Sequence, residues 1–234
     1  MAHCGINTIA EGMEAIKTFR RFCGWDGDKR KRHDEYMTDN YQKIVETNLR
    51  RLYAAPQPDL VARLAARHDG DGLLFDAFGE QCRLAPSGIQ LGDSPIPSVM
   101  GIIVSLYALT ASPETARTEP WRSFKEVPDS MLYWGAFTSN TEQALVPHVA
   151  AIKNKAESIC RAFHGTSVVG GDFAFVIHPL PKIALYYIFY EADEEFPATA
   201  NCLFSDNASS FLPVDGLADL GEYSSKRILE IVGG

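Results

Sequence analysis

The chain has 234 residues, of which 46% are hydrophobic and 22% are charged, and its formal net charge is −8 at pH 7. This composition is ordinary for a globular protein and excludes an intrinsically disordered chain. The apolar run at residues 102–109 is far shorter than the roughly 20 residues that cross a bilayer. Glu11 and Glu14 interrupt the stretch in which a signal peptide would need apolar residues. We therefore expect a soluble, cytoplasmic protein without membrane association.

The first part of the sequence predicts helices. Apolar residues at spacings of three and four predict a helix over residues 5–22: Ile6, Ile9, Met13, Ile16 and Phe19. A second helix is predicted over 34–54, which Pro56 and Pro58 end, and a short third helix over 59–68. Because such apolar stripes need a surface to cover them, we expect residues 1–55 to form a helical extension packed on the body. Residues 56–234 are expected to form a single α+β domain.

The second part alternates strands and helices irregularly. Apolar runs bounded by glycine or proline predict short strands over 73–78, 81–84 and 89–91, then over 173–177, 183–190 and 200–204. Helices are predicted over 97–111, 141–163 and 215–232, with an irregular segment over 112–137 and a five-residue hairpin loop over 178–182. The helix over 97–111 is apolar nearly all round, which is typical of a central, buried helix. This order favours an α+β fold with an antiparallel sheet packed with helices over a doubly wound one.

The charge is unevenly distributed along the chain. Residues 1–55 contain ten Lys/Arg and eight Asp/Glu, whereas the rest contains twelve and twenty-two. The basic residues centre on the run 29–33, which would suit a phosphate backbone. Acidic residues flank the run on both sides, and a nucleic-acid-binding face needs a broader basic footprint. We therefore interpret the run as a solvent-exposed loop and expect no nucleic-acid partner.

The cysteines and the search for common catalytic motifs do not identify a metal site or an active site. No two of the five cysteines have C-x-x-C spacing, so zinc-ribbon, thioredoxin and local iron–sulfur signatures are missing from the sequence. Cys160 and His164 lie four residues apart on one helix face, which is half of a zinc site or, more simply, a core thiol and a histidine at a helix end. The sequence has no nucleophile elbow, H-E-x-x-H pair or phosphate-binding glycine loop.

A run of carboxylates is the sharpest local feature. Asp193, Glu194 and Glu195 lie in a turn between two aromatic strands, and Asp206 follows the second strand. Carboxylate oxygens are the ligands that Mg²⁺ and Ca²⁺ prefer, and a carboxyl with a raised pKa can serve as an acid or base. The simpler interpretation is a solvated loop at a sheet edge, with Phe196 as its buried anchor.

An aromatic segment is the candidate for binding a flat ligand. Tyr133, Trp134 and Phe137 follow one another closely beside a glycine. Tyrosine and tryptophan offer a π surface together with a polar atom, which suits the lining of a cofactor pocket. Aromatic residues near glycine are also common in cores, so both interpretations stay open.

The C-terminal half resembles a known family. Residues 179–221 (PLPKIALYYIFYEADEEFPATANCLFSDNASSFLPVDGLADLG), with 72–75, 106–112 and 133–137, resemble the family known as domain of unknown function 3786. The similarity covers about residues 36–232 and is most specific at 193–198 and 203–206. The resemblance implies a setting of anaerobic redox or cofactor metabolism. Members fused to a ferredoxin-like module differ from this chain, whose cysteines are not clustered, and the resemblance assigns no catalytic residue.

Three functions are therefore weighed. The first is a cofactor- or partner-binding accessory protein that holds a corrinoid, a tetrapyrrole or an iron–sulfur partner at Tyr133, Trp134 and Phe137. The second is an enzyme that uses the carboxylates of residues 193–195 with Asp206, with or without a divalent metal. The third is a structural subunit that docks on a protein partner or redox complex through its N-terminal helices. The sequence does not identify a ligand, a cofactor or an oligomeric state.

Overall fold

The structure is a computed structural model that describes residues 27–55 and 59–233, with the side chains of the first helix described from Asn40 onward. The predicted helix over 5–22 therefore lies outside the described residues, as do the side chains of the basic run 29–33. The described part contains two antiparallel sheets and several helices, which confirms the predicted α+β fold class. The division into an extension over 1–55 and one domain over 56–234 stays a prediction.

The first sheet is a meander of neighbouring strands. It follows α2 (Gly27–Tyr53) and α3 (Leu60–Leu64) and contains β1 (Arg67–Asp69), β2 (Gly72–Ala77), β3 (Glu80–Ala85), β4 (Gly88–Leu91) and β5 (Ser94–Pro95). The strands lie in the order in which they occur in the sequence, and each pairs with the next. Short turns make this possible because antiparallel neighbours need only a few connecting residues.

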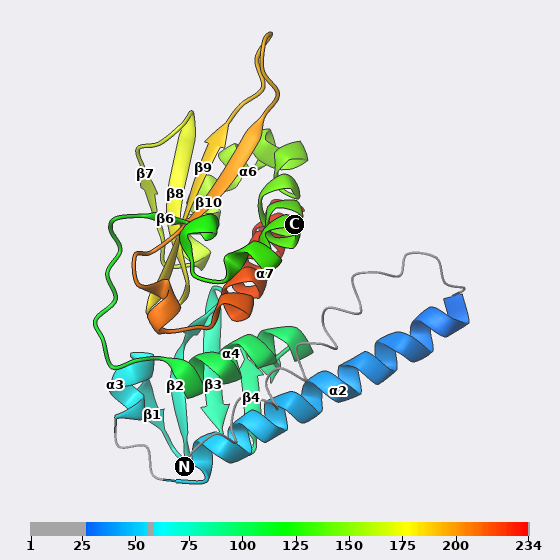
Figure 1. The fold of residues 1–234 in the computed structure, drawn as a ribbon, viewed down its shortest axis with the longest axis vertical. Helices are drawn as coiled ribbons and strands as arrows, with labels where there is room; N and C mark the ends of the chain where they lie inside the picture. The colour runs from blue at the N-terminus through cyan, green and yellow to red at the C-terminus, as the bar shows by residue number, and fades with distance from the viewer. Residues whose placement is uncertain (1–26, 56–58, 234) are drawn as a thin grey trace.

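The central helix is α4 (Ser98–Thr110), as its apolar sequence predicts. It packs against α2 on one side and α7 on another, and Ile103, Val104 and Tyr107 are completely buried. Asn48 on α2 donates a hydrogen bond of 2.9 Å from Nδ2 to Oγ of Ser105, so a buried polar pair also joins the two helices. The C-terminal half of α2 thus packs against α4, whereas its N-terminal half extends beyond the rest of the described chain (Figure 1).

The second sheet has five strands, and most of the remaining helices accompany it. Its strands are β6 (Arg122–Ser123), β7 (Thr166–Val168), β8 (Phe173–Leu180), β9 (Ile183–Tyr190) and β10 (Thr199–Phe204), in the spatial order β6-β10-β9-β8-β7. The short helices in this part of the chain are η1 (Phe124–Glu126), η2 (Ser130–Leu132), α5 (Trp134–Phe137), the π-helix η3 (Thr138–Gln143), η4 (Val146–His148) and η5 (Ala208–Ser210). The two longer helices are α6 (Val149–Ala162) and α7 (Val214–Gly233).

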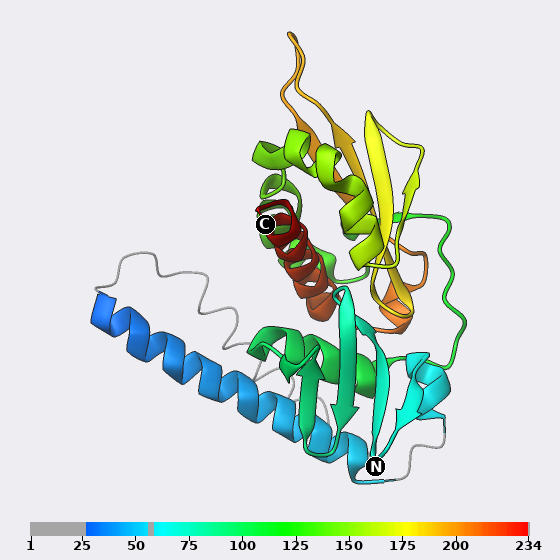
Figure 2. The same cartoon turned by 180° about the vertical axis from the view of Figure 1, so that it is seen from behind.

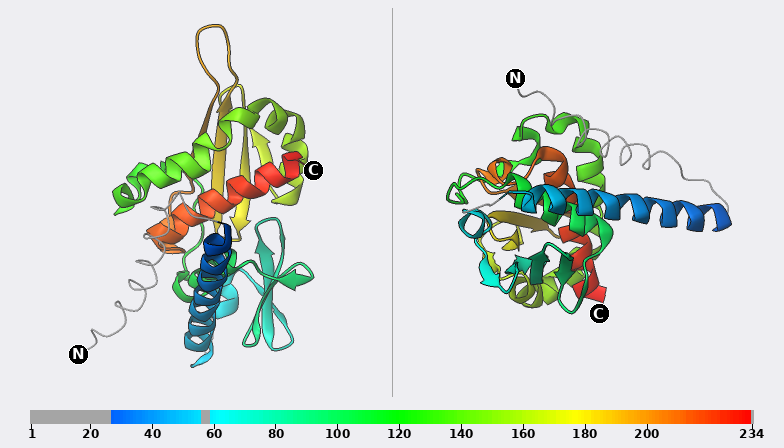
Figure 3. Two further views of the ribbon diagram at one scale, coloured as in Figure 1. Left: turned by 90° about the vertical axis from the view of Figure 1, so that its right-hand side faces the viewer. Right: turned by 90° about the horizontal axis from the view of Figure 1, so that it is seen from below.

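The two sheets lie one above the other along the long axis of the molecule (Figure 1). The helices α6 and α7 lie against one face of the second sheet, where α7 runs across the strands (Figures 2 and 3). The turn between β2 and β3 meets the second sheet, because Phe78 donates its backbone N–H to the carbonyl of Pro179 at 2.9 Å. Gly79 (φ +81°) follows, and a Cβ there would lie 2.9 Å from the Ala162 carbonyl oxygen, so only glycine allows this approach.

Some predicted details differ from the structure. The second half of the chain was expected to contribute to one sheet, but it forms a sheet of its own. The predicted five-residue hairpin loop over 178–182 is wrong, because β8 continues to Leu180 through an irregular register and leaves only Pro181 and Lys182 in the turn. The segment 112–137 contains a short strand and short helices.

A cleft between α2 and the first sheet as candidate functional site

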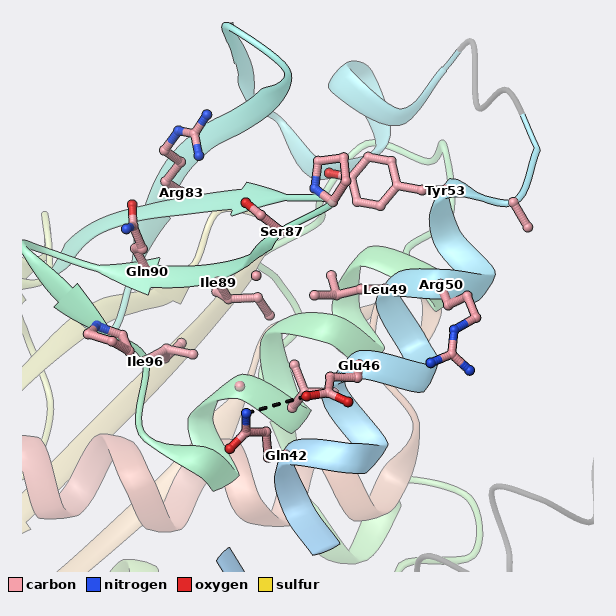
Figure 4. A pocket seen from close by; sticks show the side chains of 16 residues that line it. Gln42, Glu46, Leu49, Arg50, Tyr53, Arg83, Ser87, Ile89, Gln90 and Ile96 are labelled. Carbon is pink, nitrogen blue, oxygen red and sulfur yellow. Dashed lines mark hydrogen bonds between the residues drawn. The ribbon is translucent and has the colours of Figure 1, made fainter. Parts of the chain in front are cut away.

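A cleft of about 920 Å³ lies between the C-terminal half of α2 and the β3–β4 hairpin (Figure 4). One wall comes from a single face of α2, because its residues recur at helical spacing: Gln42, Val45, Glu46, Leu49, Arg50 and Tyr53. The opposite wall comes from residues 86–90 of the hairpin, and the lining is completed by Ala54, Arg83, Pro95, Ile96 and Gly101. A volume of this size falls within the range of about 300–1,000 Å³ for small-molecule sites.

The floor of the cleft is apolar. Leu49 and Ile89 point into it from opposite walls and are almost fully buried, whereas Val45 and Ile96 are half-buried. Gly101 allows these walls to meet, since a Cβ there would lie 3.1 Å from Cγ2 of Ile96 and 3.2 Å from Cγ2 of Val45. Val45 and Ile96 keep accessible apolar surface at the base of the concavity, which favours the binding of an apolar group.

Polar side chains surround this floor. Gln42 donates a hydrogen bond of 3.3 Å from Nε2 to Oε1 of Glu46, which leaves other amide and carboxylate atoms at the rim available. The guanidinium of Arg83 is already engaged, because it binds the carboxylates of Asp69 at 2.7 Å and Asp71 at 2.6 Å. The rim therefore offers hydrogen bonds to a ligand without a concentrated charge of one sign.

Tyr53 lies at the end of the cleft where α2 ends (Figure 4). Its hydroxyl donates a hydrogen bond of 3.2 Å to the backbone carbonyl of Leu84. Burial raises the pKa of Tyr53 above its ordinary value, and the nearby carboxylate of Asp71 adds to this effect. The phenol is therefore neutral at physiological pH and acts as a hydrogen-bond donor.

Comparison with protein families gives one match. The family model described as domain of unknown function (DUF3786) matches residues 57–227, which is most of the chain. The chain belongs to this family. The matched region of this DUF3786 protein includes the hairpin wall of the cleft but begins after α2, so α2 supplies the other wall from outside the matched region. Comparison with curated proteins and with solved structures gives no match.

The structure places the predicted aromatic site of this DUF3786 protein away from the cleft. Phe137 is only 1% exposed, and its ring stacks on Phe124 at a centroid distance of 4.3 Å and 15° between planes. Tyr133 and Trp134 are half-buried, and Nζ of Lys125 lies 4.2 Å from the ring centroid of Trp134. Protein groups thus already cover a face of Phe137 and of Trp134. Cofactor binding by these rings stays a prediction.

The predicted loop carboxylates lie in the connection between β9 and β10. Asp193 accepts hydrogen bonds at Oδ1 from the backbone N–H groups of Glu195 at 2.8 Å and Phe196 at 2.7 Å, which lower its pKa. Glu194 and Glu195 are exposed, and so is Phe196, which was expected to be a buried anchor. Asp193 thus stabilises the turn with an oxygen that would otherwise be available to a metal.

Asp206 follows the opposite end of β10, a strand of six residues and so about 20 Å long. It accepts hydrogen bonds from Arg122 at 2.9 Å and Arg117 at 3.1 Å, and these lower its pKa. The structure therefore does not bring Asp206 together with the three loop carboxylates. Within residues 40–55 and 59–233, no group of three or more His, Cys, Asp or Glu side chains is arranged to hold a metal ion.

The Cys160–His164 pair also has structural roles. Cys160 is buried, and its carbonyl accepts a hydrogen bond of 2.7 Å from the N–H of Gly165 at the end of α6. His164 lies past the helix end, with Nε2 3.5 Å from Oδ2 of Asp76 on β2. This matches the simpler interpretation of a core thiol and a histidine at a helix end.

One half-buried carboxyl was not predicted from the sequence. Glu142 lies on the π-helix η3 and accepts a hydrogen bond of 3.1 Å at Oε1 from the backbone N–H of Cys202. Burial raises the pKa of Glu142 above its ordinary value. No sequence motif predicts a role for Glu142, because it is covered by β10, which lies about 60 residues further along the chain.

The raised pKa of Glu142 predicts a pH dependence of stability. Between its unfolded and folded pKa values the folded protein binds the proton more tightly, so the free energy of unfolding falls as the pH rises through this window. A Glu142→Gln variant keeps a carbonyl acceptor for Cys202 and removes this titration. Between pH 4.5 and 7 the melting temperature of the variant should therefore rise relative to that of the unmodified protein as the pH increases. The exposed Glu157→Gln on α6 is the control, and equal pH profiles for both variants would contradict the assignment.

Proposed function

We propose that this protein is a non-catalytic binding protein that holds a largely apolar small molecule in the cleft between α2 and the first sheet. The observation that carries the proposal is the apolar floor inside a concavity of about 920 Å³, closed by two walls from separate parts of the fold. A role as an accessory protein in anaerobic redox or cofactor metabolism, which the family resemblance implies, is part of the same proposal.

The chemistry of the cleft favours binding over catalysis. Its hydrogen-bonding groups are two side-chain amides, a serine, the neutral phenol of Tyr53 and the charged Glu46 and Arg50, while Arg83 is paired with Asp69 and Asp71. General acid–base catalysis would need a titratable group tuned towards the working pH beside the reacting atoms. The carboxylates of residues 193–195 lie on a different part of the molecule, so the structure gives no geometric support to the alternative of an enzyme that uses them with Asp206.

No helix among residues 27–55 and 59–233 is long and apolar enough to cross a bilayer. Docking of a protein partner on the N-terminal helices stays a prediction, and the cleft is compatible with it because only part of α2 lines the cleft.

The proposal is tested with N-phenyl-1-naphthylamine, a neutral apolar dye whose fluorescence increases out of water. At about 0.3 kcal/mol for each of its roughly 17 non-hydrogen atoms, binding is worth about 5 kcal/mol, or a Kd on the order of 100 µM. Ile96→Glu places a carboxylate at the apolar floor and should weaken binding at least about tenfold, since burying an unpaired charge is costly. Fluorescence titration gives both affinities.

Val169→Glu is the matched control, because it makes a similar change at a side chain that is 99% exposed after β7. It should leave the Kd of the dye unchanged. Failure of the unmodified protein to bind the dye, or an equal loss in both variants, would contradict the proposed function.

A further inference from the structure

A second, smaller hollow lies beside the cleft. It has a volume of about 420 Å³ and is lined by the end of α2, by α3 and by the turn between β1 and β2. Leu60, Val61 and Leu73 give it apolar surface, and His68 and Asp71 give it polar surface. Tyr53 and Ala54 line both this hollow and the cleft. The two spaces therefore adjoin at the last turn of α2.

Tyr53 is the large side chain at this junction. Of the two residues shared by both spaces, Ala54 has only a methyl group, so the phenol ring is the main barrier. Two charged residues lie close to the ring and bind each other at 2.6 Å: Asp71, which lines the second hollow, and Arg83, which lines the cleft. The hydrogen bond from its hydroxyl to the Leu84 carbonyl holds the ring across the gap between α2 and β3 (Figure 4).

We infer that Tyr53 is a specificity-determining residue that divides one elongated apolar site into two chambers and limits the length of the ligand. The inference rests on the proposed function, since it concerns the same cleft. Compact apolar molecules fit in the larger chamber against Leu49 and Ile89. A rod-shaped apolar molecule longer than this chamber meets the ring of Tyr53 and is excluded. Removal of the ring opens the path into the second hollow.

The inference is tested with two neutral dyes of different length. N-phenyl-1-naphthylamine is compact, whereas 1,6-diphenyl-1,3,5-hexatriene is an apolar rod. The unmodified protein should bind the compact dye and bind the rod at least about tenfold more weakly. Tyr53→Ala should improve binding of the rod by about tenfold, so the ratio of the two affinities should shift towards the rod.

Two further variants separate the ring from its hydroxyl and from its contribution to folding. Tyr53→Phe removes the hydrogen bond to Leu84 but keeps the ring, so it should still exclude the rod. Tyr53→Leu keeps an apolar contact with the core and shortens the wall, and it replaces Tyr53→Ala if circular dichroism shows that the alanine variant is unfolded. Tyr190→Ala, at an exposed tyrosine of β9, is the control and should leave both affinities unchanged.

The outcomes distinguish this inference from the proposed function. Binding of the compact dye with no gain for the rod in Tyr53→Ala or Tyr53→Leu would overturn the role of Tyr53 and leave the proposed function intact. Equal binding of both dyes by the unmodified protein would likewise overturn the role of Tyr53 and leave the proposed function intact. Binding of neither dye by the unmodified protein would remove the proposed function and this inference together.

Discussion

Replacing Phe137 with alanine is expected to destabilise the protein by about 4 kcal/mol, the usual cost of emptying a fully packed phenylalanine site. The ring is 1% exposed and lies within aromatic contact distance of Phe124, Trp134 and Phe204. Its removal leaves a cavity among rings that hold the short helices against the second sheet. For a chain of this length the melting temperature should fall by about 10 °C. Thermal unfolding followed by circular dichroism measures the change.

Met131→Ala is the control for this experiment. Met131 belongs to the same segment but is 71% exposed, so its truncation should change the melting temperature little. A Phe137→Ala protein that keeps its stability but loses a bound chromophore would instead support the cofactor site predicted for these aromatic residues.

Replacing Lys182 with methionine is expected to destabilise the protein by about 3 kcal/mol, because hydrogen bonds to a charged group contribute about 1.5–3 kcal/mol each. Lys182 is 8% exposed, and its Nζ donates to the carbonyls of Ser112 at 3.1 Å and Glu114 at 2.9 Å. These carbonyls follow α4, so the lysine ties the β8–β9 turn to the connection between the two sheets. Methionine keeps most of the side-chain volume and removes only the charged donor.

Lys155→Met on the exposed face of α6 is the matched control for Lys182→Met. Urea unfolding should give a lower midpoint for the Lys182 variant and an unchanged midpoint for the Lys155 variant. Equal midpoints for the two variants would show that the buried ammonium group contributes nothing to stability.

Local patterns in the sequence predict the larger elements of the fold. β8 and β9 are rich in β-branched and aromatic residues, and α4 is apolar on nearly every side, so each element is recognisable by itself. The short strands are different. All residues of β7 are exposed, and β6 has two residues that pair with the distant β10, so tertiary pairing defines both strands. A two- or three-residue strand has no periodicity to detect.

The candidate cleft was missed for a similar reason. The spacing of Val45, Leu49 and Tyr53 places them on one helix face, and the second predicted helix includes them. A helix face alone does not distinguish a buried contact from a lined cavity. The opposite wall, which includes Ile89 and Gln90, lies about 40 residues along the chain, and only the fold brings the walls together. The acidic and aromatic clusters predict sites because their residues are close together in the sequence. In the structure, neighbouring protein groups already contact Asp193, Asp206 and Phe137.

The strand order has a consequence for synthesis on the ribosome. Every pairing in the first sheet joins neighbouring strands, so β1 to β5 can pair as soon as each one leaves the exit tunnel. In the second sheet, Arg122 pairs with Phe204, so β6 can pair only after the other four strands of its sheet have been synthesised. Local pairings form faster than distant ones. The nascent chain should therefore acquire its first sheet early, with α4 exposing the apolar side that later contacts α7, and this side is where a chaperone would bind before release.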